Sequence, residues 1–296
     1  MKIFKNMSVV CGMMTVCAGL VFNVTAGEKL TIAGSSTVKP IAEAASKAFK
    51  ATHPDVMVII GGGGSSSGVK NAGQGTVDIG MASRKVKDKE MNQFPSLVPI
   101  PIGLDGVAII VNKKNPVNSI TRSQLQQIYT GEMTSWKALG GNDASIDLVG
   151  ILLKHGTAEV FMKFAGLEGV EEGEGAGKVI RYKKDGATAS GSVTAKGADG
   201  NKPACAAVLT KPNAISFASI GFAQSLAEKG AGIKLLELDG VKPEIVNVKN
   251  GSYPLVRPLQ VITNGEATGL AAEFIDFLMG SKGQKIVADK GYIPAK

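Results

Sequence analysis

Apolar and polar residues follow two different periods along the chain, and the two periods alternate. Short apolar runs rich in β-branched residues predict strands at residues 29–33, 56–60, 76–81, 104–112, 148–153, 214–218 and 255–263. Apolar residues three or four apart predict helices between these strands, and the clearest set is Val38, Ile41, Ala42, Ala45 and Phe49. Strands that alternate with helices favour an α/β protein built in layers.

Two segments show neither period, and we predict that both are connections. Residues 171–177 are rich in glycine and glutamate, which is typical of an exposed loop. Residues 185–200 form a longer polar stretch with several glycines. The alanine-rich stretch around Cys205 is predicted to be helical, and a final helix carries Leu270, Phe274, Phe277 and Leu278.

The first 26 residues have the pattern of a secretory signal peptide. Lys2 and Lys5 precede a largely apolar run at residues 7–24, and the small residues Thr25 and Ala26 come before Gly27. An uncleaved membrane anchor is the alternative, because the run approaches the length that spans a bilayer. Glycines within the run and the small residues after it favour cleavage. We therefore predict residues 1–26 as a signal peptide and a periplasmic location.

Charge and cysteine content narrow the class of the exported chain. Without Lys2 and Lys5, the 33 lysines and arginines of the full chain fall to 31, against 25 aspartates and glutamates. A positive balance attracts anions. The lysines are scattered and Trp136 is the single tryptophan, so nucleic acid is not an expected partner. Cys205 is the only cysteine left, which excludes an internal disulfide, and we predict a small core residue there.

Three small-residue turns stand where helices are predicted to begin. They are Gly34-Ser35-Ser36-Thr37, the stretch from Gly61 to Gly68, and His155-Gly156-Thr157. The first amide groups of a helix have no partner within it, and the helix dipole adds partial positive charge. Such a helix start holds an oxyanion. Ser36 and Thr157 as ordinary N-caps remain the alternative for each turn alone, whereas three turns together favour an anion site.

Several motifs in a fixed order connect the chain with a known family. They are Ala33-Gly34-Ser35-Ser36-Thr37, Gly62-Gly63-Gly64-Ser65, Gly75-Thr76-Val77-Asp78-Ile79, Ala82-Ser83-Arg84, Gln124-Leu125, Ile128-Tyr129-Thr130-Gly131, Trp136-Lys137, Gly140-Gly141, Gly251-Ser252-Tyr253-Pro254-Leu255, Arg257-Pro258-Leu259 and Gly291-Tyr292-Ile293-Pro294. The chain resembles the periplasmic phosphate-binding proteins that serve ABC-type phosphate importers. The resemblance extends over residues 30–294.

This resemblance implies an α/β, two-lobe periplasmic binding protein fold of type II, with two mixed sheets flanked by helices and a two-strand hinge. The first lobe would combine residues 27–107 with 257–296, and the second would hold residues 108–256. The chain would cross between lobes near residues 103–112 and 252–263. A monomer that binds inorganic phosphate in the cleft and delivers it to a membrane ABC permease complex is the implied function.

The resemblance also implies which residues meet the ligand. From the first lobe these are Ser36, Thr37, Ser65, Ser83 and Arg84, and from the second they are His155, Gly156 and Thr157. A solvated arginine at the start of a basic run is the alternative for Arg84. Asp78 is a candidate acceptor for a protonated oxyanion, but an aspartate at a strand end more often caps a turn, and we favour that interpretation.

The second-lobe turn departs from the family pattern. Ile151 stands where the family usually has arginine, and His155 where it has serine. The loss of a bidentate arginine removes a strong contact to a tetrahedral anion. Lys154 or His155 is a candidate replacement, and a histidine would make binding depend on pH. The alternative function is therefore a receptor of the same fold for another oxyanion or a less charged ligand.

Catalysis is not expected. The chain has only two histidines, His53 and His155, and no short spacing of metal ligands, so neither a metal nor another cofactor is predicted. A serine nucleophile would need an activating base. His155 near Ser36 or Ser65 is the only candidate, and the sequence does not bring these residues together.

Overall fold

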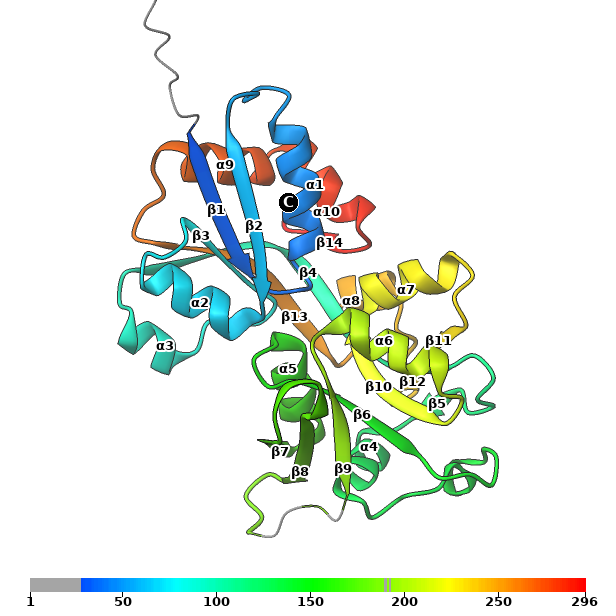
Figure 1. The fold of residues 1–296 in the computed structure, drawn as a ribbon. Coiled ribbons are helices and arrows are strands. Elements are labelled where there is room, and N and C mark those ends of the chain that lie inside the picture. The colour runs from blue at the N-terminus through cyan, green and yellow to red at the C-terminus, as the bar shows by residue number, and fades with distance from the viewer. Residues whose placement is uncertain (1–27, 189–190, 192) are drawn as a thin grey trace, which may run out of the picture.

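The computed structural model describes residues 28–188, 191 and 193–296. The predicted signal peptide at residues 1–26 lies outside these residues. Two α/β lobes lie one above the other in Figure 1, and two long strands, β4 and β13, run between them. Buried apolar side chains form separate clusters on the two sides of these strands.

The first lobe contains both ends of the described chain. Its elements are β1 (Lys29–Gly34), α1 (Lys39–Phe49), β2 (Met57–Gly63), α2 (Ser65–Gly73), β3 (Ile79–Ala82), α3 (Asp88–Gln93), α9 (Gly269–Met279), α10 (Ser281–Asp289) and β14 (Ile293–Pro294). Strands β2, β1 and β3 are parallel neighbours, and β13 joins β3 antiparallel. The core forms where Phe49 of α1 meets Phe274 of α9 edge to face, with ring centroids 5.4 Å apart.

The second lobe lies between the two crossings of the chain. Its helices are α4 (Arg122–Thr130), α5 (Gly156–Ala165), α6 (Asn201–Thr210), α7 (Ile220–Glu228) and α8 (Ile245–Lys249), with 3₁₀ turns at Trp136–Leu139 and Gly175–Gly177. Its strands are β5 (Ser119–Ile120), β6 (Asp147–Ile151), β7 (Leu167–Glu172), β8 (Val179–Lys184), β9 (Thr194–Ala198), β10 (Ala214–Ser219), β11 (Ile233–Leu235) and β12 (Glu237–Leu238).

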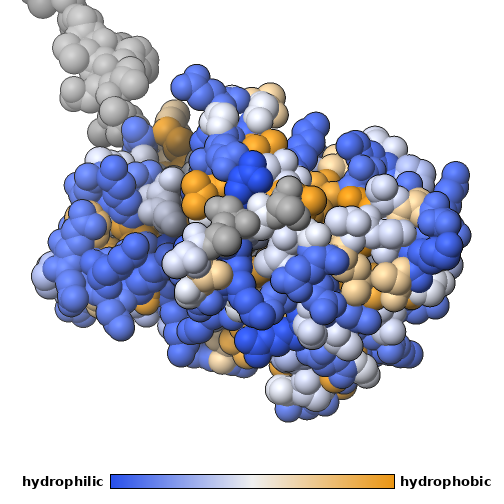
Figure 2. All heavy atoms as spheres, turned by 90° about the horizontal axis from the view of Figure 1, so that it is seen from below, coloured by the Kyte–Doolittle hydropathy of each residue, from blue (hydrophilic) through white to orange (hydrophobic). Residues whose placement is uncertain are grey.

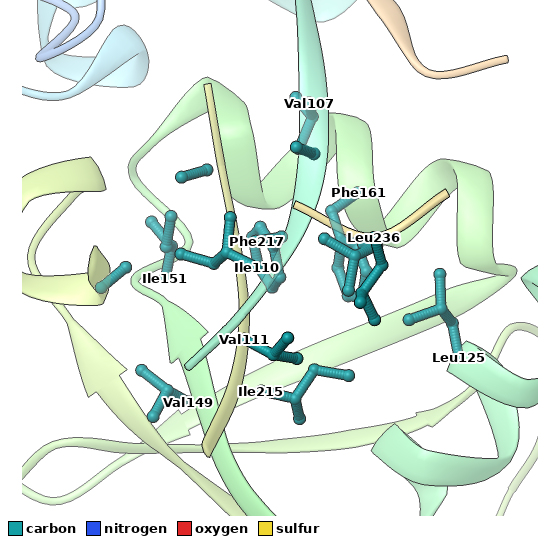
Figure 3. Close-up of a cluster of buried hydrophobic side chains, with 14 of the residues drawn as sticks. Val107, Ile110, Val111, Leu125, Val149, Ile151, Phe161, Ile215, Phe217 and Leu236 are labelled. Carbon is teal, nitrogen blue, oxygen red and sulfur yellow. The ribbon is translucent and has the colours of Figure 1, made fainter. Parts of the chain in front are cut away.

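The core of the second lobe is aromatic at its centre. Phe161 of α5 stacks on Phe217 of β10 with ring centroids 3.9 Å apart, and Tyr129 of α4 meets Phe161 edge to face at 4.8 Å. Figure 3 shows Phe161 and Phe217 among the aliphatic side chains of this cluster, and Ile151 is one of them. The position where the family usually has arginine is therefore packed into the lobe core. It does not form a dry wall of the cleft.

Two antiparallel strands join the lobes. Strand β4 (Leu97–Asn112) pairs with β13 (Val256–Asn264) from Leu97 to Gly106, and its remaining residues pair with β10 from Val107 to Val111. The strand is thus shared by the sheets of both lobes, and the hydrogen-bonded path through them is continuous. The predicted crossings at residues 103–112 and 252–263 fall on these two strands.

Most predicted elements are confirmed, and two predicted connections are wrong. The segment 171–177 begins inside β7, and the segment 185–200 contains β9. Strand β7 is an edge strand paired only with β8, and β9 is buried at only some positions. Neither needs a strongly apolar sequence, so glycine, glutamate and lysine hid both strands.

The outer surface is polar. In the face that Figure 2 shows, hydrophilic residues dominate and hydrophobic ones form scattered patches. Across the described residues, no helix is both long and apolar enough to cross a membrane.

Candidate anion-binding site between the lobes

Four helix starts meet where the lobes face each other. Gly64, at the start of α2, approaches the second lobe so closely that a β-carbon there would lie 2.6 Å from the carbonyl oxygen of Lys154. A β-carbon on Gly156, at the start of α5, would lie 2.7 Å from Ser65 Oγ. At the start of α6, one on Gly200 would lie 2.9 Å from Ser36 Oγ. Glycine is required at these contacts because any side chain would hold the lobes apart.

Several amide groups at these helix starts remain available. Within the described chain, the N–H groups of Ser65, Gly156 and Thr157 have no protein acceptor. The turn before α1 differs, because Ser35 Oγ accepts from the N–H groups of Thr37 and Val38 at 3.2 and 3.3 Å. Neither Ser36 nor Thr157 is therefore the N-cap of its helix: Ser35 does the capping at α1, and Thr157 lies inside α5. The free donors come from α2 and α5.

A fully buried arginine lies at the base of the site. Arg257 extends from β13, and its Nη1 donates to Thr157 Oγ1 of the second lobe at 2.7 Å and to Ser83 Oγ of the first at 3.2 Å. Its Nη2 donates to Thr37 Oγ1 at 3.2 Å. Since these hydroxyl oxygens accept from Arg257, each keeps its own proton for another acceptor. The arginine thus aims hydroxyl groups of both lobes at one place.

Asp105 balances the charge of Arg257 from the neighbouring strand β4. Its Oδ2 accepts from Nη2 at 2.8 Å and from Nε at 3.1 Å, and neither side chain is exposed. Burial raises the pKa of Asp105, and the Arg257 guanidinium offsets part of this rise. The pair sits opposite itself in the β4–β13 register, so the two hinge strands fix its position.

Asn201 and Ser65 complete the same pattern. Asn201, the first residue of α6, donates from Nδ2 to Thr37 Oγ1 at 3.0 Å across the cleft. Ser65 Oγ accepts from the N–H of Ser83 at 3.0 Å. Each contact occupies an acceptor position of a hydroxyl and leaves its proton free. The site is therefore rich in donors, which suits a ligand that consists of acceptors.

His155 bridges the lobes on one side of the site. Its Nε2 lies 2.6 Å from Asp199 Oδ1, and its Nδ1 lies 3.4 Å from Ser36 Oγ. Burial lowers the pKa of His155, and the hydrogen bond to Asp199 offsets part of this. The neutral ring donates from Nε2, because a carboxylate only accepts, so Nδ1 is an acceptor that faces Ser36. Lys154 pairs with the outer side of Asp199 at 2.9 Å.

Arg84 lies at the edge of the site and not in its centre. Its Nη1 and Nη2 donate to both carboxylate oxygens of Glu90 at 2.7 and 2.6 Å, and its Nε lies 3.0 Å from Glu159 Oε2 of the second lobe. Only 2% of the side chain is exposed, so it is not a solvated arginine. Its charge is already matched by two carboxylates.

The structure thus brings most predicted site residues together: Ser36, Thr37, Ser65, Ser83, His155, Gly156 and Thr157 line one space, and Arg84 borders it. Sequence reasoning missed Arg257, Asn201 and Asp105. A signal for two of them was present, because Asp105 and Arg257 are charged residues within otherwise apolar strands. A charge in such a strand needs a partner, and each is the partner of the other.

Two other predicted residues have structural places. Asp78 accepts at Oδ2 from the N–H and the hydroxyl of Thr31, both at 2.7 Å, which supports its interpretation as a local cap. Cys205 is buried in α6, and burial raises the pKa of its thiol to about 12, as expected of a core residue. In the part of the chain that the structure describes, no three His, Cys, Asp or Glu side chains cluster as metal ligands would.

Comparison with known proteins agrees with this geometry. Residues 23–282 match the PBP superfamily domain. The chain belongs to the PBP superfamily. The predicted two-lobe α/β fold of a binding protein is thereby confirmed.

Among PBP superfamily members, the chain is 36% identical over 270 residues to the phosphate-binding protein PstS of Bacillus subtilis, covering 91% of this chain and 81% of that one. A Clostridium perfringens structure described as a phosphate ABC transporter substrate-binding protein with bound phosphate superimposes with a TM-score of 0.78. It is 34% identical and is covered completely by 91% of this chain. An ABC-type phosphate transport receptor from Vibrio cholerae is 28% identical, with a TM-score of 0.68 over 89% of this chain and 99% of that one.

Proposed function

We propose that the chain captures inorganic phosphate between its lobes and delivers it to an ABC importer. The observation that carries the proposal is the contact set of Arg257, which turns hydroxyl groups of both lobes toward one place above a buried positive charge. Free amide groups at the starts of α2 and α5 add donors to the same place. The relatives and solved structures named above are phosphate-binding proteins, which supports phosphate as the anion.

Phosphate suits this donor set because it is small, tetrahedral and rich in acceptors. Arg257 supplies the positive charge that the family places on the strand before α5, where this chain has Ile151. Charge-assisted hydrogen bonds are about twice as strong as neutral ones, so a buried arginine outweighs several hydroxyls. The partial positive charge of the helix starts acts in the same direction.

We propose that residues 27–107 and 257–296 form one lobe, that residues 108–256 form the other, and that they move about β4 and β13. Contacts that cross the cleft, such as Asn201 to Thr37 and Arg257 to Thr157, exist only when the lobes are closed. A ligand that bonds both lobes favours the closed state by this differential contact. Small-angle scattering with and without phosphate tests this, since closure reduces the radius of gyration.

Calorimetry with the chain lacking residues 1–26 tests the ligand. We expect phosphate to bind with a sub-millimolar Kd, and sulfate, nitrate and acetate to bind more weakly. No heat with millimolar phosphate would reject the proposal. His155 gives the alternative anion its only remaining support, because Ile151 lies in the lobe core. A larger thermal shift with another oxyanion than with phosphate would favour that alternative.

We propose binding and not catalysis, although Ser36, His155 and Asp199 lie in a row. Thr37, Ser65 and Thr157 are at most 2% exposed around the same space, which fits a small anion and leaves no room for the leaving group of an ester. Incubation with 4-nitrophenyl phosphate tests this. Release of nitrophenol that His155→Ala abolishes would establish catalysis instead.

The remaining proposals concern where the chain works and with what. We propose a monomer in the periplasm, released by cleavage after residue 26, that docks on a membrane permease complex. The mass of the protein recovered by osmotic shock tests the location and the cleavage site together. Light scattering tests the monomer.

A further inference from the structure

A groove of about 690 Å³ opens beside the site, and both lobes form its walls. The first lobe contributes residues 84–88, the second contributes Arg122 and residues 159–164, and hinge residues 254–258 form the floor. We call it the mouth groove. Arg84 separates it from the site, because the Cγ of Arg84 would lie 3.1 Å from a β-carbon on Gly156.

The mouth groove is strongly basic. Six basic side chains line it against two acidic ones, Asp88 and Glu159. Lys85, Arg122 and Lys163 have no carboxylate within ion-pair distance in the described part of the chain. Arg122 is held in place over the ring of Phe164, with its guanidinium carbon 5.5 Å from the ring centre. The three unpaired cations come from both lobes and face one space.

Glu159 is the acidic side chain that joins the lobes at this groove. It belongs to α5 of the second lobe, and its Oε2 lies 3.0 Å from Arg84 Nε and 2.6 Å from Lys87 Nζ of the first lobe. When the lobes separate, Glu159 moves away from both cations. Arg84 keeps Glu90, but Lys87 loses its carboxylate. The mouth is therefore more positive when open than when closed.

We propose that the mouth groove is an anion-collecting site, in which Lys85, Arg122 and Lys163 hold phosphate transiently on its way to the buried site. Glu159 takes over the pairing of Arg84 and Lys87 as the lobes close behind the anion. The inference rests on the proposed function and adds the route and the residues of capture. It assigns these lysines and Arg122 to the rate of association and not to the closed complex.

The physical basis is electrostatic steering. A cleft lined by one sign of charge raises the local concentration of the opposite ion and its association rate, by about 10-fold or more, and salt screens the effect. Groups that act only on the encounter change kon and leave koff unaltered. Groups that also hold the lobes together change koff.

The test measures both rates by stopped flow. A fluorophore on Gly62→Cys reports closure, because a β-carbon at Gly62 meets nothing within 4 Å and Cys205 is buried. In the chain lacking residues 1–26, we expect Arg122→Gln with Lys163→Gln to lower kon for phosphate about threefold to tenfold at low salt, with koff unchanged. The difference should vanish at high salt. Lys47→Gln with Lys50→Gln on α1 is the matched control, since it removes the same charge far from the groove.

Glu159→Gln separates collection from a merely structural role. It removes the cross-lobe pairs and leaves the mouth more basic, so we expect kon and koff both to rise. A kon and salt dependence for the Arg122 and Lys163 double variant equal to those of the α1 control would overturn the collecting site while calorimetric phosphate binding stands. Absence of any phosphate signal in the unmodified protein would overturn the proposed function and this inference together.

Discussion

Two buried arginines border the cleft, and their surroundings differ. Arg257 at the base has one carboxylate, Asp105, and otherwise donates to Thr37, Ser83 and Thr157. Arg84 at the mouth contacts two carboxylates, Glu90 and Glu159. Burial would raise the pKa of Glu90, but hydrogen bonds from Arg84 and from the Lys87 backbone outweigh this and lower it.

This comparison shows that burial of an arginine does not by itself indicate a ligand site. The charge of Arg84 is fully matched within the protein, so an anion would have to displace a carboxylate. The charge of Arg257 reaches the cleft through neutral hydroxyls, which can donate onward to an anion at no such cost. The partners of an arginine therefore decide between an anion site and a link between lobes.

Substitution of the two arginines is the strongest test of this distinction. We expect Arg257→Met to weaken phosphate binding about a thousandfold, since loss of a buried charge partner costs about 2–5 kcal/mol. Arg84→Met should weaken it by about tenfold or less, because only the link to Glu159 is lost. Calorimetry measures both. Equal losses in the two variants would remove the distinction.

Arg257→Met also leaves Asp105 buried without its partner, which should destabilise the fold by about 3–5 kcal/mol. The double variant with Asp105→Leu serves as the control, because replacement of a whole buried pair by apolar residues is often neutral. Urea unfolding should show recovered stability in the double variant, while phosphate binding stays lost. Binding that returns along with stability would mean that Arg257 has only a structural role.

Gly64 tests whether the close contact of the lobes matters for binding. Its φ of +93° disfavours any side chain, at a cost of about 1–3 kcal/mol, and a β-carbon would also meet Lys154 of the other lobe. Gly64→Ala should therefore lose stability and about tenfold in phosphate affinity. Gly75→Ala is the control, with φ of +66° and open space around the β-carbon, and it should lose stability alone. An equal loss of affinity in both would refute the closure argument.

The hydroxyl groups that Arg257 orients should contribute less each. We expect Thr37→Val and Thr157→Val to weaken phosphate binding about tenfold apiece, in line with about 1–1.5 kcal/mol for a hydrogen bond. Thr210→Val is the control, because that hydroxyl bonds only to carbonyls of its own helix. Calorimetry that shows no difference between the three variants would place the anion elsewhere.

Local patterns in the sequence predicted much of this arrangement. Three glycine and hydroxyl turns pointed to helix starts, and the structure gathers them at one place because parallel strands present their carboxyl ends at a common edge. The fourth start, at Gly200 and Asn201, was hidden in a segment that had been predicted as a plain connection. Strand β9 leads into it, and its lysine and glycines give no apolar signal.

Long-range pairing is what the sequence did not disclose. Arg257 and Asp105 are 152 residues apart, and only the register of β4 and β13 brings them together. The loss of an arginine at Ile151 therefore suggested a weakened site, whereas the structure has a buried arginine from the hinge. Arg84 posed the opposite problem, because Glu159, which completes its pairing, comes from the other lobe.

The smallest expected effect concerns the protonation of His155. Burial sets its folded pKa below the ordinary value of 6.5, so the unfolded chain binds a proton more readily. The stability from neutral His155 is present above pH 6.5 and falls as pH drops through the folded pKa, by at most about 1.4 kcal/mol per pH unit. Without phosphate, urea unfolding of His155→Gln should show a shallower loss from pH 7 to pH 5 than the unmodified chain. His53→Gln should keep the original slope, because His53 lies on the outer surface beside Glu273. A His155→Gln slope equal to the original would mean that the ring is charged in the folded protein, and Nδ1 would then donate to Ser36 and the anion.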